Sequence, residues 1–317
     1  MPTTAPSTMR TVRFHEYGDA ADVLRLETAP VPEPGPGRIR IAVHACGLAP
    51  ADWALCGGLF AGLLPRGIGI DVAGTVDAVG PDVDGVKVGD RVVGTADWRT
   101  CTSAGAADRA VLNRWVPVPS ELDLTRAAAL PMAIDTAYRH LQRLGLERET
   151  TLLVSGGGTT IGFAAVQIAL LRGLHVVTTA GATHTAALQR LGAVVVPYGP
   201  GLADRVLSAV GHPVDLVLDT APVTGGLPEL VAAAGGLPQH VLTITDVTSA
   251  PALGVRDSFH EDWSQVADGL AEFVGLAAEG RFTVPIARTF PLEDWRTALE
   301  LSRSNQAHGK LLLLPQH

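Results

Sequence analysis

The 317-residue chain carries a formal net charge of −8, has a sequence pI near 5.6 and contains 47% hydrophobic residues. This length exceeds one average domain and is enough for two domains with sizeable cores. The acidic balance and the scattered Lys and Arg residues argue against nucleic acid or an anionic membrane as a partner, so small molecules are favoured.

The cysteines and the amino-terminal residues indicate a compartment. Cys46, Cys56 and Cys101 have no CxxC spacing and form an odd count, which fits free thiols in a reducing environment. The first residues, MPTTAPST, lack the basic start and the apolar region of a signal peptide, so we expect a cytoplasmic protein. Residues 150–171 contain no charge, but the Gly156–Thr160 interruption favours a strand, a turn and a helix over a membrane span.

Residues 11–121 contain short β-type runs separated by turn residues. They include RIRIAVHAC, GTVDAVG and KVGDRVVG, with the proline-rich PVPEPGPG before the first of them. Runs of this length between Gly, Pro and Asp clusters predict an all-β, barrel-like domain.

From residue 122 to residue 258 strands alternate with helices. The predicted strands are TLLVS, HVVTT, AVVVP, DLVLD and HVLTI, and the predicted helices cover 161–172, 185–191 and 202–210. Buried strands separated by helices of this length predict parallel βαβ units in a doubly wound sheet.

The carboxyl-terminal part returns to strands. It begins with a helix at SQVADGLAEFVGLAAEG and continues with a strand pair around FTVPIARTF, a helix at 292–302 and a last strand, KLLLL. This order predicts that the tail joins the first domain, which then comprises residues 1–121 and 259–317, while residues 122–258 form the second domain.

The stretch TLLVSGGGTTIG, residues 151–162, has the pattern of a phosphate-binding turn. In such a turn the first glycine permits the tight bend, the second lets the backbone approach the pyrophosphate, and the third lets the helix pack on the strand. The frame Gly157-x-Thr159-x-x-Gly162 replaces the second glycine by Thr159. If the φ angle of Thr159 must be positive, the strain costs roughly 1–3 kcal/mol and weakens binding by about one or two decades.

Two features of the same turn favour nucleotide binding. The hydroxyls of Thr159 and Thr160 can donate to phosphate oxygens, and the helix that begins there supplies free amides and positive potential. The sequence is therefore compatible with a weakened or re-aimed nucleotide site, or with a tight strand-to-helix turn that holds no ligand.

The acidic residue expected about twenty positions after the turn is absent, because HVVTT is followed by Ala180 and Gly181. Without a carboxylate for the ribose 2′-hydroxyl, a 2′-phosphate is not repelled, and NADPH is favoured over NADH. His184 and Arg190 are candidates for the cation that meets this phosphate, or are ordinary surface residues.

Motifs along nearly the whole chain carry a resemblance to a known family. They are VRFHEYG, AVHACGLAPADW, GIDVAGTVDAVG, VGDRVVG, AAALPMAIDTAY, the glycine turn with FAAVQIA, LGAVVVPYG, DLVLDTA and HGKLLL. In their order and spacing they resemble the zinc-independent quinone oxidoreductases of the medium-chain dehydrogenase/reductase superfamily. The resemblance implies an α/β fold with a Rossmann doubly wound parallel sheet domain and a discontinuous GroES-like β-barrel catalytic domain. It further implies a homodimer that uses NADPH to pass hydride to quinones or other α,β-unsaturated carbonyl compounds.

The resemblance also places a cofactor site. It implies a nicotinamide-side contact at Thr136, an adenosine-side contact at Tyr198, and further contacts at Gly157, Gly158, Thr159, Thr160, Ile161, Thr179, Thr220, Ala221 and Ile244. Tyr198 is also an ordinary strand-end aromatic, and the Thr136 hydroxyl can be satisfied inside its own helix.

The residues at the positions of the zinc ligands argue against a bound zinc ion. Zinc-using relatives place a cysteine and a His-Glu pair where this chain has Ala49 and Ile70-Asp71, and three cysteines cannot form a four-cysteine zinc lobe. We therefore expect no bound metal.

The departures from the family pattern concentrate near the nicotinamide and the substrate. Ala49 stands where the family often has asparagine, Cys56 where it has arginine, and Leu59-Phe60 where it has a tyrosine. Near the adenosine phosphate, Thr185 and Gly181 replace a lysine and a serine. Asp52 and Thr136 are the candidate catalytic residues. Tyr138 and His44 lie in segments where a proton donor could stand. Asp52 and Asp71 can instead be carboxylates that stabilise turns. Water can also supply the proton, so that no protein acid is needed.

Apolar residues suggest the character of the substrate. A flat hydrophobic molecule would suit a cleft lined by Ala49, Trp53, Leu55, Leu59, Phe60 and Leu63, although the same residues can be domain core. Three functions remain open: an NADPH-dependent quinone or enone reductase, a non-redox enzyme such as a cyclase or isomerase on the same scaffold, and a binding protein that keeps the turn for stability.

Overall fold

The computed structural model describes residues 7–145, 148–264 and 266–315. The chain divides into two compact units, one made of residues 1–132 and 270–317 and the other of residues 133–269. Each division lies eleven residues beyond the boundary placed from the sequence, at 132/133 against 121/122 and at 269/270 against 258/259. Packing explains the first shift, because helix α3 (Leu124–Ala127) contacts strands β3 (Ile39–Leu48) and β5 (Asp71–Val79) of the first unit.

The first unit is built from two sheets. A small sheet has the order β2 (Arg25–Pro30), β1 (Thr8–Phe14), β4 (Arg66–Gly67). A larger sheet has the order β14 (Ile286–Pro291), β15 (Lys310–Leu314), β3, β5, β6 (Arg91–Ala96), β7 (Arg109–Pro117), and β3 also pairs with β7. This second pairing closes β3, β5, β6 and β7 on themselves, so the predicted barrel-like domain is confirmed.

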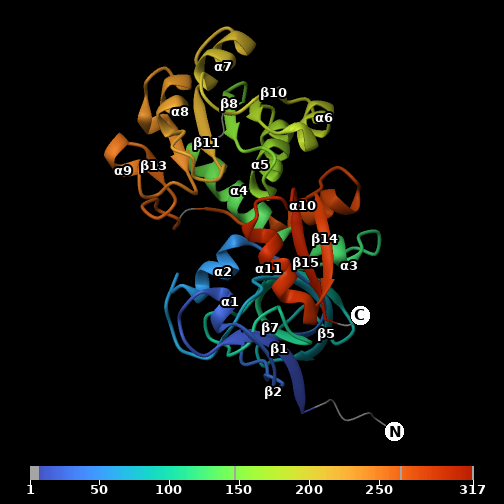
Figure 1. The fold of residues 1–317 in the computed structure, drawn as a ribbon. Helices are drawn as coiled ribbons and strands as arrows, with labels where there is room; N and C mark the ends of the chain where they lie inside the picture. Colours follow the sequence, from blue (N-terminus) through green and yellow to red (C-terminus); the bar gives the residue numbers. More distant parts are fainter. Residues whose placement is uncertain (1–6, 146–147, 265, 316–317) are drawn as a thin grey trace. The chain divides into compact units, whose positions relative to one another are not determined.

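Both ends of the chain contribute to the larger sheet. Figure 1 shows the red strands β14 and β15 in the same unit as the blue and teal strands from the amino-terminal third. Strand β15 pairs with β14 in parallel and with β3 antiparallel. The strand pair predicted around FTVPIARTF is wrong, because only Ile286–Pro291 is a strand and its partner in the sheet is β15.

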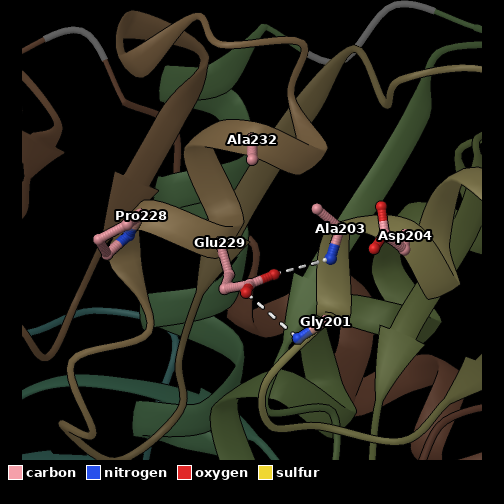
Figure 2. A pocket seen from close by; sticks show the side chains of 6 residues that line it. All are labelled: Gly201, Ala203, Asp204, Pro228, Glu229 and Ala232. Carbon is pink, nitrogen blue, oxygen red and sulfur yellow. Dashed lines mark hydrogen bonds between the residues drawn. The ribbon is translucent and has the colours of Figure 1, made fainter.

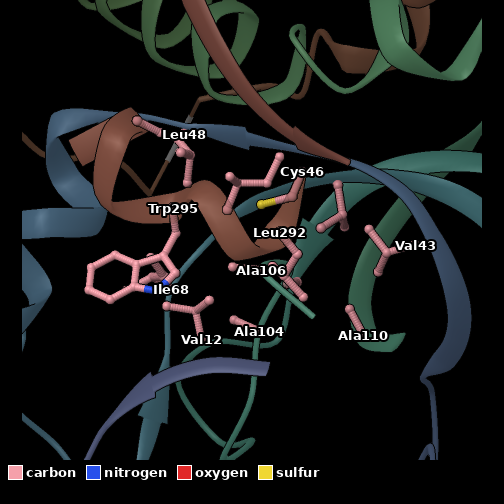
Figure 3. Packing of buried hydrophobic residues seen from close by; sticks show 14 of the residues in the cluster. Val12, Val43, Cys46, Leu48, Ile68, Ala104, Ala106, Ala110, Leu292 and Trp295 are labelled. Carbon is pink, nitrogen blue, oxygen red and sulfur yellow. The ribbon is translucent and has the colours of Figure 1, made fainter. Parts of the chain in front are cut away.

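One apolar core stabilises the first unit. It joins side chains from the barrel strands with others from the carboxyl-terminal segment, among them Val12, Val43, Ile68, Leu292 and Trp295 (Figure 3). These residues are at most 3% exposed. Burial of apolar surface from both chain ends makes each end necessary for the stability of the unit.

The second unit contains one parallel sheet. Its strand order is β10 (Val194–Val196), β9 (His175–Thr179), β8 (Thr151–Ser155), β11 (Leu216–Asp219), β12 (Val241–Thr243), β13 (Arg256–Asp257), and every pairing is parallel. Numbered within the unit, this is the order 3-2-1-4-5-6 of a doubly wound dinucleotide-binding sheet, and the prediction is confirmed. The order reverses between β8 and β11, where ligands of such sheets bind.

The helices of the two units are mostly short. The second unit has α5 (Thr160–Leu171), α6 (Ala182–Leu191), α7 (Leu202–Val210), α8 (Leu227–Ala233) and α9 (Ala250–Leu253), and α4 (Pro131–Leu144) begins at the end of the first unit. The first unit also has α1 (Ala20–Val23), α2 (Pro50–Cys56), α10 (Leu270–Ala278) and α11 (Trp295–Arg303). Within the described residues, no helix has the length and apolar character needed to cross a membrane.

Candidate functional site

The glycine turn joins β8 to α5 at the point where the strand order reverses. Gly156 has a φ of +85°, a left-handed conformation that favours glycine. A Cβ atom on Gly162 would collide with the carbonyl oxygen of Gly156 and lie 2.6 Å from Oγ1 of Thr220. A Cβ atom on Gly157 would collide with the side chain of Thr178. Gly156 is therefore required by conformation, whereas Gly157 and Gly162 are required by close packing.

Thr159 adopts an unstrained conformation. Its φ is −77° and its ψ is 161°, so the positive φ on which the expected strain depended does not occur. Thr159 is the N-cap of α5, and its Oγ1 accepts a hydrogen bond of 2.9 Å from the N–H of Gly162. The same Oγ1 lies 3.1 Å from Oγ1 of Thr220. The hydroxyl therefore caps the helix as a hydrogen-bond acceptor, and its donation to a phosphate stays a prediction.

Backbone N–H groups of the turn are left for a ligand. The N–H groups of Gly156 and Gly157 donate to Oγ1 and O of Thr179, and that of Thr159 donates to the carbonyl of Gly156. The N–H groups of Gly162 and Phe163 donate to Thr159. Those of Gly158, Thr160 and Ile161 have no hydrogen-bond partner among the described residues. Three unpaired amides at the first turn of a helix form an anion-binding site.

The other predicted contacts on this sheet lie at the carboxyl ends of neighbouring strands. Thr179 ends β9, Thr220 and Ala221 follow β11, and Ile244 follows β12. Thr179 and Thr220 are buried, and the Thr220 hydroxyl donates to the carbonyl of Ser155 at 2.9 Å. The structure therefore gathers these residues at one edge of the sheet, where the two threonines shape the turn.

Asp219 is a buried residue of this edge that the sequence analysis missed. Its Oδ2 accepts a hydrogen bond from Oγ1 of Thr243 at 2.8 Å, and its Oδ1 accepts from the N–H of Ala221 at 3.3 Å. Burial raises the pKa of this carboxyl group above its ordinary value. It links β11 to β12 through Thr243, and its place in DLVLD, as the last residue of a buried strand, was the available signal.

Tyr198 lies beside the amino end of α6. It is 70% exposed, and its Cε1 would be 3.8 Å from a Cβ atom on Gly181, the N-cap of that helix. Arg205 holds the segment that carries Tyr198 by donating to the carbonyl oxygens of Pro197, Gly199 and Pro200. No residue pattern around Arg205 indicated this role.

The two candidate cations for a 2′-phosphate have different positions on α6. His184 lies in the first turn, is only 8% exposed and packs its ring against the edge of Phe163. Arg190 lies in the last turn, about 9 Å beyond His184 along the helix axis by the usual rise of ~1.5 Å per residue. Arg190 therefore lies away from the amino end of α6, and only His184 remains near it.

A hollow of about 300 Å³ lies apart from these residues, between α7 and α8 (Figure 2). Glu229 of α8 reaches across it and accepts hydrogen bonds from the N–H groups of Gly201 and Ala203 at the start of α7. These bonds and the nearby Arg205 lower the pKa of Glu229. None of the predicted cofactor residues lines this hollow, so we assign Glu229 the role of a helix cap supplied by a neighbouring helix.

Helix α4 carries Thr136 and a buried histidine one turn further on. Nδ1 of His140 lies 2.6 Å from the carbonyl oxygen of Thr136, and Nε2 lies 2.6 Å from Oγ of Ser258. Burial lowers the pKa of His140 to about 4. The neutral ring thus donates to Thr136 and accepts from Ser258, which ties α4 to the segment after β13. The Thr136 hydroxyl itself bonds to no other described residue, so the alternative of a hydroxyl satisfied inside the helix loses its support.

Asp52 is a structural carboxylate in this fold. Its side chain is fully buried, Oδ1 accepts from the N–H groups of Gly69 and Ile70, and Oδ2 accepts from that of Ala49. Burial raises its pKa to about 6. A carboxylate with no exposed surface and three backbone donors stabilises a turn, so the structure contradicts a catalytic role for Asp52.

Asp71 is equally buried and is paired. Its Oδ2 lies 2.7 Å from Nζ of Lys310, and its Oδ1 accepts from the N–H of Met132. Burial raises the pKa of Asp71 despite the opposing effect of Lys310. Among the described residues, no group of three or more His, Cys, Asp or Glu side chains is arranged to hold a metal ion.

The apolar residues assigned to a substrate cleft divide into two sets. Trp53 and Leu55 are at most 8% exposed and belong to the core of the first unit, so their assignment to a cleft is wrong. Phe60 is 47% exposed and Leu63 is 89% exposed. His44 is half-buried and bonds to Thr125, at 3.2 Å between Nε2 and Oγ1.

Comparisons with known proteins match two stretches of the chain. The alcohol dehydrogenase GroES-like domain family matches residues 35–119, and the zinc-binding dehydrogenase family matches residues 180–313. The chain is 30% identical to a quinone oxidoreductase of Lama guanicoe over 98% of this chain and 99% of that protein. It is 29% identical to the chloroplastic quinone-oxidoreductase QR1 of Triphysaria versicolor over 97% and 98%.

A solved structure agrees in fold over the same length. The quinone oxidoreductase from Coxiella burnetii has a TM-score of 0.81 and 27% sequence identity, and covers 98% of this chain and 100% of its own. The GroES-like and Rossmann folds implied by the resemblance are thereby confirmed. The chain is an oxidoreductase and belongs to the zinc-independent quinone oxidoreductase family of the medium-chain dehydrogenase/reductase superfamily.

Proposed function

We propose that this protein is an NADPH-dependent reductase of quinones or other α,β-unsaturated carbonyl compounds. The family implies a nicotinamide cofactor, and the observation that supports it most strongly is the turn between β8 and α5. There the unpaired N–H groups of Gly158, Thr160 and Ile161 meet the positive end of the α5 dipole. An uncharged turn with free donors fits a pyrophosphate.

The same turn is organised by side chains that do not contact the ligand. Thr159 caps α5, Thr179 receives the N–H of Gly156, and Thr220 contacts the Thr159 hydroxyl. These bonds fix the backbone that presents the three free amides. A preformed donor set binds with little cost of reorganisation.

NADPH is preferred over NADH in this proposal because of the first turn of α6. Strand β9 ends at Thr179 and is followed by Ala180 and Gly181, so no carboxylate stands where a ribose 2′-hydroxyl would be accepted. Tyr198 next to Gly181 offers a ring for the adenine side, and His184 offers an imidazole at the amino end of the helix. The site therefore lacks the repulsion that would exclude a 2′-phosphate.

The bound nicotinamide would supply the hydride. We propose that the hydroxyl of Thr136 contacts the nicotinamide side and that Ala221 and Ile244 line the edge of the sheet next to it. Asp52 supplies no proton because it is fully buried. We therefore propose water as the proton donor, so that reduction adds one hydride and one proton to the substrate and leaves NADP⁺.

Parallel equilibrium titrations with NADPH and NADH test the cofactor proposal, with tryptophan quenching or energy transfer to the nicotinamide as the signal. Micromolar NADPH binding with much weaker NADH binding is the expected result. Absence of binding of either nucleotide at millimolar concentration would overturn it. NADPH consumption with a quinone or enone then tests the reaction, whereas turnover of a substrate without nicotinamide would indicate the cyclase or isomerase alternative. The homodimer and the cytoplasmic location stay predictions.

A further inference from the structure

His140 joins helix α4 to the residue that directly follows β13, within the second unit. Its side chain is buried, with Nδ1 2.6 Å from the carbonyl oxygen of Thr136 and Nε2 2.6 Å from Oγ of Ser258. A carbonyl oxygen can only accept, so Nδ1 carries the proton and Nε2 accepts from the Ser258 hydroxyl. One ring thus connects the residue that we assign to the nicotinamide side with the edge of the parallel sheet.

Ser258 is fixed at the carboxyl ends of β12 and β13. Its N–H donates to the carbonyl oxygen of Thr243, the last residue of β12, at 3.1 Å. Its own carbonyl oxygen accepts from Nε1 of Trp263 at 3.1 Å. Ile244, which we assign to the cofactor site, directly follows Thr243. The bond from Ser258 to His140 therefore ties α4 to the strand end that carries Ile244.

The position of α4 along the sheet depends on this bond more than on apolar packing. Ile134, Ala137 and Leu141 of α4 are fully buried, but burial of apolar surface is non-directional and tolerates small displacements of a helix. Hydrogen bonds to His140 have a defined length and direction, and they cannot follow such a displacement without weakening. The ring also contacts Trp263, at 4.7 Å between ring centres. These contacts leave the imidazole a single orientation.

We propose that His140 is a positioning residue for hydride transfer: through Thr136 and Ser258 it holds the Thr136 hydroxyl in register with the strand end that carries Ile244, and thereby orients the nicotinamide ring. This inference rests on the proposed NADPH-dependent function. A small misplacement of a reacting group slows a reaction strongly. It costs little affinity here, because the pyrophosphate is assigned to the separate turn between β8 and α5.

Ser258→Ala is the main test, because it removes one hydroxyl from the bridge and leaves the apolar packing of α4 intact. With a quinone or an enone we expect kcat to fall about tenfold, while the Kd for NADPH stays within about twofold of the wild-type value. Ser258→Thr keeps the hydroxyl and should retain the wild-type kcat. His140→Ala should lower kcat at least as much as Ser258→Ala, and the double variant should be no slower than His140→Ala.

The emission of bound NADPH provides a readout that needs no turnover. A nicotinamide ring held in one orientation shows high anisotropy and a long fluorescence lifetime. We expect both to fall in Ser258→Ala and His140→Ala although NADPH is still bound, and to be restored in Ser258→Thr. Unchanged emission together with a kcat within about twofold of the wild-type value in Ser258→Ala would overturn the inference.

Gln142→Ala is the matched control. The Gln142 side chain accepts from the N–H of Ala267 at 3.1 Å and donates to its carbonyl oxygen at 3.3 Å. It therefore also ties α4 to the segment after β13, but without a bond to Thr136 or to the sheet edge. We expect no change in kcat or in the nicotinamide emission. An equal loss in Gln142→Ala and Ser258→Ala would show a general loosening of α4 and would reject the role of His140.

The two readouts separate this inference from the proposed reaction. If neither a quinone nor an enone is reduced, but NADPH binds and its ordered emission is lost in Ser258→Ala, the positioning role stands and the proposed reaction fails. If the wild-type protein and Ser258→Ala reduce the substrate equally, the reductase stands and the positioning role fails. Absence of NADPH binding to the wild-type protein would overturn both.

Discussion

The glycine turn of the second unit and the buried acids of the first unit use polar groups in opposite ways. In the turn, the N–H groups of Gly158, Thr160 and Ile161 have no partner among the described residues, although those of Gly156, Gly157 and Thr159 are hydrogen-bonded. In the first unit, each oxygen of Asp52 and Asp71 is matched by a donor inside the protein. Free donors on a rigid frame indicate a binding site, whereas fully used buried charges indicate a structural role.

The largest expected effect is on the structural side of this comparison. Lys310→Met leaves the Asp71 carboxylate buried without its cation, so we expect the free energy of unfolding to fall by about 3–5 kcal/mol. Urea denaturation of the variant and the wild-type protein measures this difference in the free energy of unfolding. The double variant Lys310→Met with Asp71→Leu should recover most of the loss, because no charge is then buried alone. A single variant that loses less than about 1 kcal/mol would show that the pair is not structural.

The buried His140 gives the next effect, through pH. Its pKa of about 4 lies below the ordinary value of 6.5, so between these values the unfolded chain binds more protons than the folded protein. The contribution of the neutral ring is complete above about pH 6.5 and is lost as the pH falls to about 4, with a maximum of about 3 kcal/mol.

The comparison with His140→Gln isolates this contribution. The stability advantage of the wild-type protein over the variant should shrink between about pH 6.5 and pH 4 in urea titrations, because the variant has no ring to protonate. Asp52, whose raised pKa has the opposite sign, is present in both proteins and cancels in the difference. A difference that stays constant across this range would contradict a neutral buried His140.

Close packing in the turn predicts the third effect. Gly162→Ala should destabilise the fold by about 1–3 kcal/mol and abolish measurable NADPH binding, because the new methyl group would collide with the Gly156 carbonyl. Gly275→Ala is the control, since Gly275 lies in α10 with nothing within 4 Å of a new Cβ atom, and this change should be neutral or slightly stabilising. Unchanged NADPH affinity in Gly162→Ala would remove the turn from the cofactor site.

The smallest effect concerns the residue that departs from the glycine pattern. Because the φ of Thr159 is −77°, Thr159→Gly relieves no strain and should not tighten NADPH binding. Loss of the capping hydroxyl should instead cost a few tenths of a kcal/mol in stability, and Thr159→Ser should behave like the wild type. Isothermal titration calorimetry of the three proteins measures their NADPH affinity. Tenfold tighter binding by the glycine variant would show that Thr159 strains the turn after all.

Periodicity and turn residues were sufficient to predict much of the second unit. The bounds 202–210, 151–155 and 175–179 match α7, β8 and β9 to the residue, because alternation of buried strands with amphipathic helices is a local property of the sequence. The discontinuous barrel was anticipated from the return to strands after Phe259. The β14 region was misjudged because one parallel strand and its flanking loop have the same residue types as a hairpin.

The site was predictable only where the chemistry is local. The glycine turn was evident from adjacent residues, but the φ of Thr159 and the unpaired amides depend on contacts with Thr179, at the end of β9, and with Thr220, directly after β11. Asp71 and Lys310 meet from opposite ends of the chain, and nothing in either segment predicts the pairing.

The position of β15 has a consequence during synthesis. Residues 133–269 leave the ribosome before Lys310 does, so the parallel sheet of the second unit can form while the barrel still lacks the strand between β14 and β3. Until then the core of the amino-terminal segment lacks the side chains of the carboxyl-terminal segment, and the Asp71 carboxyl lacks Lys310. We therefore expect the nascent amino-terminal third to expose apolar surface until residue 310 has been synthesised, and a chain that stalls before that residue to be prone to aggregation.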